Sequence, residues 1–134
     1  MNALTNSIAR ALYALPFGVF GILHFINASA MAGMVPVPGG AFWVYLTGLI
    51  FLAACVSILT ERKTYLAGLV LGITLLVFVL TIHLPAIINA ADAMAMQNSL
   101  TQLLKDTALA GGAFYIAGRY RHHEPSAAST DPAI

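Results

Sequence analysis

The sequence has very little charge. Only 8% of its 134 residues are Asp, Glu, Lys or Arg, whereas an ordinary soluble domain carries roughly 25%. Six basic and five acidic side chains cannot give a small soluble fold a polar surface. The composition therefore excludes a soluble enzyme and a disordered chain. The net charge of +1 also excludes a nucleic-acid binder, because phosphate binding needs a dense basic face.

Cysteine is nearly absent as well. Cys55 is the only one, so the chain can form no internal disulfide. A thiol relay that makes or reduces disulfides is excluded, because it requires paired cysteines. Cys55 lies among small apolar residues, and we expect it to pack against a neighbouring helix.

Most of the remaining sequence is hydrophobic, at 60% of residues and a mean hydropathy of +0.86. An apolar stretch of about 20 residues spans the hydrocarbon core of a bilayer. The apolar runs are continuous rather than alternating, which favours helices over barrel strands. We therefore predict an all-α membrane protein, in which residues 1–121 form a bundle of four transmembrane helices. The expected spans cover about 7–27, 41–60, 64–88 and 100–118.

The basic residues predict the orientation of this bundle. With four crossings, all but Lys105 fall on one side of the membrane, namely Arg10, Arg62, Lys63, Arg119 and Arg121. Positively charged loops stay inside, so we expect both termini to be cytoplasmic. The polar residues 122–134 include Pro125 and Pro132, and we expect them to form a disordered cytoplasmic tail.

Small residues four positions apart indicate where helices approach one another closely. Three predicted spans contain such a pair: Ala14 and Gly18, Gly68 and Gly72, and Ala108 and Gly112.

Polar side chains recur at similar depths. At about 1.5 Å per residue from the inner charges, His24 and Asp106 lie roughly 20 Å into the membrane. The same count places Tyr45 and Asn27 at roughly 24–25 Å and His83 at about 30 Å. These residues therefore converge on the outer half of the bundle.

The fourth span strengthens this prediction. The stretch from Asp106 to Arg119 is only about 20 Å long, so the helix must continue outward through Lys105 and Asp106. An unpaired charge there costs roughly 3 kcal/mol. We expect Lys105 to extend outward and Asp106 to face the bundle. Our hypothesis is an outward-opening pocket for an apolar molecule with a polar head, such as a quinone or a lipid. Its candidate ligand-binding residues are His24, Asn27, Tyr45, His83, Lys105 and Asp106.

Simpler interpretations stand beside this one. Buried polar groups often only tie helices together, at about 0.6 kcal/mol per bond, and His83 next to Leu84-Pro85 can cap a kinked helix end. Trp43 is typical of an interfacial aromatic. Haem is disfavoured, because the depths of His24 and His83 differ by about 9 Å. Copper bound by the two His and the methionines is disfavoured as well, because methionine is a general packing residue. The cofactor stays open, with a quinone as one candidate.

Three motifs resemble the DoxX family, over about residues 8–119. They are Phe17-Gly18-x-x-Gly21-x-x-His24-Phe25, Ile82-His83-Leu84-Pro85, and Lys105-Asp106-x-Ala108-Leu109-Ala110-Gly111-Gly112. Two further segments, 31–36 and 42–48, are similar to its small, single-domain bacterial branch. The resemblance implies a multi-pass protein of the bacterial inner membrane, related to proteins linked to membrane redox complexes. It implies no family-wide catalytic residues.

Two functions follow as alternatives. The chain is either a redox-associated subunit with a quinone or lipid pocket, or a non-catalytic accessory or assembly subunit that docks onto a larger membrane complex. Whether it is an enzyme stays open. Its expected partners are the bilayer and either another membrane protein or a second copy of itself. A channel is disfavoured, because four short helices enclose no pore.

Overall fold

The computed structural model describes residues 2–122, which contain helices and no strand. The long helices are α1 (Ser7–Ile26), α3 (Gly40–Thr60), α4 (Thr64–Phe78) and α6 (Ala93–Tyr120). The short elements are η1 (Ala3–Thr5), α2 (Ala28–Ala32), η2 (Val79–His83) and α5 (Leu84–Ile88). The all-helical prediction is thus confirmed, whereas the predicted disordered tail, apart from residue 122, lies outside the described residues.

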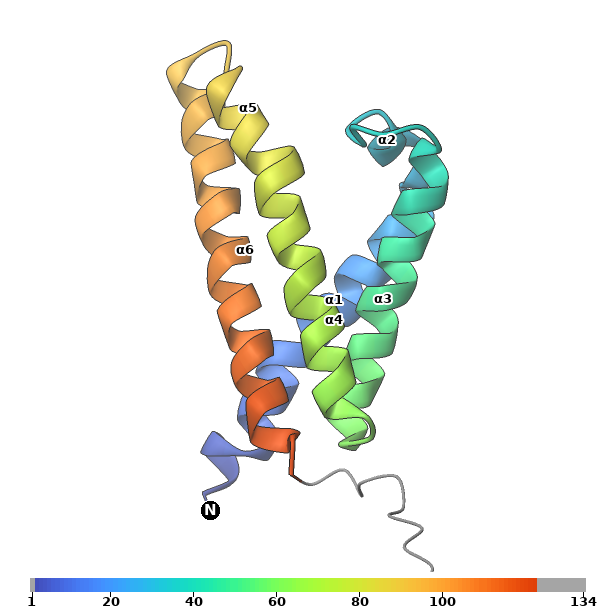
Figure 1. The fold of residues 1–134 in the computed structure, drawn as a ribbon, viewed down its shortest axis with the longest axis vertical. Helices are drawn as coiled ribbons and strands as arrows, with labels where there is room; N and C mark the ends of the chain where they lie inside the picture. The colour runs from blue at the N-terminus through green and yellow to red at the C-terminus, as the bar shows by residue number, and fades with distance from the viewer. Residues whose placement is uncertain (1, 123–134) are drawn as a thin grey trace, which may run out of the picture.

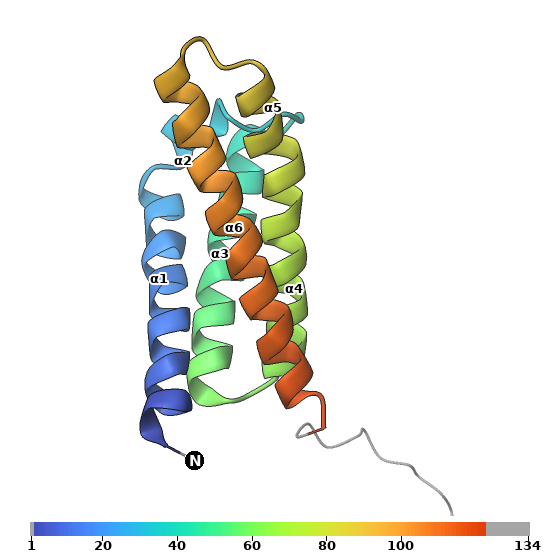
Figure 2. The same cartoon turned by 90° about the vertical axis from the view of Figure 1, so that its left-hand side faces the viewer.

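The long helices form two pairs that diverge along their length (Figure 1). Helix α1 packs mainly on α3, and α4 packs mainly on α6. The pairs meet at the turn between α3 and α4, which we call the closed end. They separate toward α2 and α5, which mark the open end (Figure 1). Residue 2 and the C-terminal end of α6 both lie at the closed end (Figures 1 and 2).

A small apolar core fills the region where the pairs meet. Phe17, Phe51, Leu71 and Leu75 are buried there among alanines of α1 and α6. Much of the remaining apolar surface points outward, and Leu12, for example, is 69% exposed. An apolar exterior of this extent suits lipid rather than water.

Three segments are long and apolar enough to cross a membrane: Ala3–Ile26, Gly40–Thr60 and Thr64–Ile88. They coincide with the first three spans predicted from the sequence. Helix α6 has 28 residues, which corresponds to about 42 Å, but it is less apolar than these three.

Glycines allow the close helix contacts. A Cβ atom on Gly68 would lie 2.7 Å from the carbonyl oxygen of Ala113, so α4 and α6 touch there through their backbones. The α1–α3 contact depends on Gly21 and Gly48, a pair that the four-residue spacing did not reveal. Ala108, by contrast, is exposed, and takes no part in a buried helix contact.

The third predicted span is one continuous run of helix, but it changes geometry before Pro85. Residues Val79–His83 form a π-helical turn between α4 and α5. A proline inside a helix clashes with the carbonyl group four residues earlier, which here belongs to Thr81. A wider turn is a common way to accommodate such a clash.

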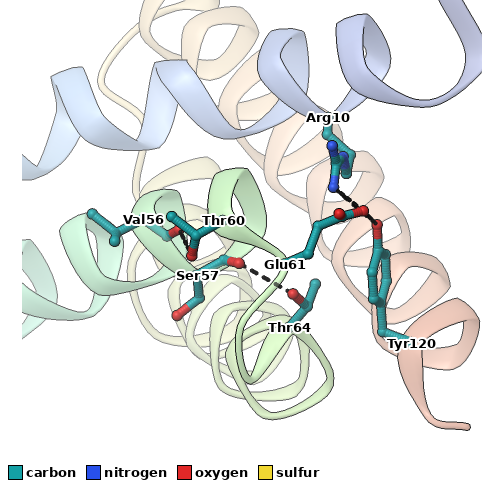
Figure 3. Close-up of polar contacts among 7 residues, drawn as sticks. All are labelled: Arg10, Val56, Ser57, Thr60, Glu61, Thr64 and Tyr120. Atoms are coloured by element: carbon teal, nitrogen blue, oxygen red, sulfur yellow. Dashed lines mark hydrogen bonds and ion pairs between the residues drawn. The ribbon is translucent and has the colours of Figure 1, made fainter. Parts of the chain in front are cut away.

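Polar contacts join three segments at the closed end (Figure 3). Arg10 of α1 forms an ion pair with Glu61 in the α3–α4 turn. Arg10 Nη1 donates a hydrogen bond to the Tyr120 hydroxyl at 3.1 Å, and that hydroxyl donates to Glu61 Oε1 at 2.6 Å. In the same turn, Thr64 Oγ1 donates to the carbonyl group of Ser57 at 3.1 Å. We call Arg10, Glu61 and Tyr120 the Arg10 clamp.

Candidate functional site: an amphiphilic cleft

A cleft of about 880 Å³ lies between the two helix pairs, and its lining includes residues of the loop before α3 at the open end. Aromatic and aliphatic side chains of α1, α3 and α4 line most of it, including Phe17, Phe20, Ile50, Phe51, Leu75 and Phe78. Helix α6 supplies a different wall, with Asn98, Ser99, Gln102, Lys105 and Asp106. The cleft therefore has an apolar side and a polar side.

Asp106 is the most deeply buried ionisable residue of this wall, at 5% exposure. Its Oδ2 atom lies 2.8 Å from His83 Nε2. Its Oδ1 atom lies 3.5 Å from Lys105 Nζ. Both carboxylate oxygens thus have a partner that can carry positive charge, which offsets the cost of burying the carboxylate.

The contact between His83 and Asp106 corrects the depth count, which separated them by about 10 Å. Each Cα–Cβ bond tilts toward the N-terminus of its own helix. The segment that carries His83 and helix α6 run antiparallel, so the two side chains point toward each other along the helix axes. A depth count that uses only Cα positions does not include how far the two side chains extend along the helix axes.

His24 lines the same cleft but does not contact Asp106. Its Nδ1 atom lies 2.7 Å from the carbonyl oxygen of Phe20, one turn earlier in α1. A carbonyl oxygen only accepts hydrogen bonds, so Nδ1 carries the proton. In the neutral ring, Nε2 is then an acceptor. The ring also packs edge-on against Phe51, at 5.2 Å between centroids.

Lys105 does not simply extend outward, as the sequence suggested. Its ammonium group lies 5.4 Å from the centroid of the Phe20 ring, in a cation–π contact. Since it also faces Asp106, Lys105 connects α6 to the opposite helix pair. Its side chain is 43% exposed.

The other two predicted site residues lie elsewhere. Asn27 is exposed at the junction between α1 and α2, and Tyr45 is 46% exposed and contacts the Phe25 ring. Neither lines the cleft. Depth counting gives the height of a residue along the bundle, but not the side of the helix on which it lies.

Sequence reasoning missed part of the polar wall. Asn98, Gln102 and Asp106 follow one another every four residues, so they share one face of α6. This spacing was a usable signal, but the predicted span began only at residue 100. In fact Asp92 caps the helix earlier, since its carboxylate accepts a hydrogen bond from Ala95 N at 2.8 Å.

Trp43, which we expected at the membrane interface, lines the cleft. Its indole Nε1 donates a hydrogen bond to the carbonyl group of Pro38 at 2.9 Å. This bond holds the loop before α3 against the open end of the cleft.

This site offers hydrogen-bond donors and acceptors. Within residues 2–122, no three His, Cys, Asp or Glu side chains gather closely enough to hold a metal ion. The polar groups of the site are the ammonium group of Lys105, the hydrogen-bonded His83–Asp106 pair and an acceptor on His24. Such groups beside aromatic walls suit a flat, apolar molecule with a polar head.

Comparisons of the chain with protein-family models, with curated proteins and with solved structures find no match.

Proposed function

We propose that the chain is an integral membrane protein of DoxX type whose cleft binds a quinone, as a redox-associated subunit in the bacterial inner membrane. The observation that carries this proposal is the buried Asp106 carboxylate, paired with His83 and Lys105, at the side of an otherwise apolar cleft. A carboxylate used only to join two helices has no need of a cleft beside it.

The cleft matches the needs of a quinone head in size and in polarity. Its volume of about 880 Å³ lies within the range of roughly 300–1,000 Å³ that is typical of small-molecule sites. Phe20 and Phe78, which are both partly exposed, offer ring surface to a planar head group. Lys105 can donate a hydrogen bond to a quinone carbonyl, and His24 Nε2 can accept one from a quinol hydroxyl.

The membrane arrangement proposed with this function has four crossings. Helix α6 is about 42 Å long, enough to cross a bilayer, and its two ionisable residues in the slab pair with each other. Its C-terminal end lies with Arg10 and the Glu61–Lys63 turn at the closed end. By the positive-inside rule, this end is cytoplasmic.

The only tryptophan of the sequence allows a direct test, because Trp43 lines the cleft. Protein in lipid nanodiscs would be titrated with a short-chain benzoquinone while the tryptophan fluorescence is recorded. We expect saturable quenching in the wild type, and an at least tenfold weaker affinity in Asp106→Asn and His83→Gln. The Trp43→Phe variant measures the signal that does not come from the cleft.

The matched control is Asp92→Asn, which removes a carboxylate outside the cleft and keeps a good helix cap. It should bind like the wild type. Linear, non-saturating quenching, or equal affinity in Asp106→Asn and the wild type, would overturn the proposal. Either result would favour the alternative of a non-catalytic accessory subunit, in which the cluster only joins α4 to α6.

A further inference from the structure

A second pocket lies at the closed end and shares no lining residue with the cleft. It has a volume of about 480 Å³ and is bounded by α1 with its preceding turn on one side and by α6 on the other. Arg10, Arg119 and Asn6 contribute polar groups to it. Ala9 and Ile116 contribute apolar surface between them.

The described residues at this end carry more positive than negative formal charge. Five are cationic: Arg10 in α1, Arg62 and Lys63 in the α3–α4 turn, Arg119 in the last turn of α6, and Arg121 just after it. Among the described residues of this end, Glu61 is the one acidic side chain, and it forms an ion pair with Arg10.

Arg10 has unused hydrogen-bonding capacity. Its Nη1 atom contacts Glu61 and the Tyr120 hydroxyl, but its Nε–H group is buried and has no hydrogen-bond partner among residues 2–122. A buried donor without a partner costs roughly 1–3 kcal/mol. An acceptor supplied by a ligand would remove this cost.

The pocket combines these donors with an apolar groove. Tyr13 and Gly112 continue its lining toward the middle of the bundle, where the ring of Tyr13 lies directly over Gly112. A free anion uses only the charged part of such a site, whereas a phospholipid uses both parts. Basic pockets between helices at the cytoplasmic side of a membrane are typical sites for anionic lipid headgroups.

We propose that this pocket binds an anionic phospholipid. Its phosphate group lies between Arg10 and Arg119, and the start of one acyl chain follows the groove over Ala9 and Ile116. A bound lipid would then join α1 to α6 at the closed end, beside the Arg10 clamp.

Native mass spectrometry of the delipidated protein in mild detergent tests this directly. The probes are phosphatidylglycerol, phosphatidylcholine and inorganic phosphate. We expect phosphatidylglycerol to bind at least tenfold more tightly than phosphatidylcholine. Arg119→Gln should abolish this preference, and Arg121→Gln should keep it, because Arg121 carries the same charge but does not line the pocket.

A second variant controls for the case that Arg119→Gln does not fold correctly. Ala9→Phe changes no charge and fills the groove, so it should also weaken phosphatidylglycerol binding at least tenfold. Three results would each overturn the proposal: equal binding of both lipids, equal losses in Arg119→Gln and Arg121→Gln, or competition by inorganic phosphate at the affinity of the lipid. The last result would indicate a site for a free anion.

Discussion

The closed and open ends of this bundle are built from the same four long helices and differ in what lies between them. At the closed end, the ring of Tyr13 in α1 lies against Gly112 of α6, and the Arg10 clamp ties α1 to α6 and to the α3–α4 turn. At the open end, bulky rings such as Phe20 and Phe78 line the space between the pairs, and the cleft remains. Side-chain size thus determines whether neighbouring helices close or separate.

The polar contacts of the two ends differ in how deeply their acidic side chains are buried. Glu61 is about half exposed, at 48%, so water and lipid headgroups can replace part of its interactions. Within the described part of the chain, the side-chain partners of Asp106 are His83 and Lys105, in an apolar setting. Burial makes the loss of one partner far more costly at the open end. Three substitutions test this comparison.

Asp106→Leu should be the most destabilising. It leaves His83 and Lys105 without their shared anion, and breaking a buried pair costs about 3–5 kcal/mol. We expect a loss of about 3 kcal/mol, since Lys105 is partly exposed. Reversible unfolding in detergent, followed by circular dichroism, measures it.

The double variant His83→Leu/Asp106→Leu is the control for this prediction. Replacing both partners by apolar residues is often close to neutral, so most of the lost stability should return. If the double variant is no more stable than Asp106→Leu, His83 and Asp106 are not energetically coupled, and the comparison of the two ends fails.

Gly68→Ala should have the second largest effect. The new Cβ atom would lie 2.7 Å from a backbone oxygen, and overpacking of this kind costs about 1–3 kcal/mol. Gly111→Ala is the matched control, because nothing lies within 4 Å of its Cβ position. The control should gain up to about 1 kcal/mol from helix propensity. Similar melting temperatures for the two variants would contradict the close contact of α4 with α6.

Glu61→Gln should have the smallest effect. The amide can still accept a hydrogen bond from Tyr120, but it no longer offers a charge to Arg10. We expect a loss of about 0.5–1 kcal/mol, which is typical of exposed ion pairs. The difference from the wild type should shrink as salt is added. A loss of stability as large as that of Asp106→Leu would mean that losing a charged partner costs as much at the closed end as at the open end.

Partial burial, together with the hydrogen bond to Glu61, raises the pKa of the Tyr120 hydroxyl. The hydroxyl therefore stays protonated near neutral pH and remains a donor in the Arg10 clamp.

Much of the fold was predictable because long apolar runs have few alternatives. Continuous hydrophobic stretches bounded by Arg10, the Arg62–Lys63 turn and Arg119 indicate helices and their approximate ends. The π-helical turn before Pro85 was not predictable in this form, since a proline also permits a kink or a helix end. The early start of α6 depended on the Asp92 cap, within a stretch of mixed polarity.

The candidate site was only partly predictable. Depth counting brought together His24, His83, Lys105 and Asp106, all of which line the cleft. It also included Tyr45 and Asn27, which lie elsewhere. Height along a bundle follows from residue number, whereas the direction of a side chain depends on how each helix is rotated against its neighbours.

The sequence by itself determined that this chain is helical, that three of its segments suit a membrane, and that ionisable residues lie within an apolar stretch. These properties follow from composition and spacing, which act locally along the chain. Only the tertiary structure decided that Asp106 pairs with His83 and Lys105, that Phe20 lies beneath Lys105, and that the helix pairs separate around a cleft. These contacts join residues on different helices, so they depend on the packing of glycines and aromatic rings where the helices cross.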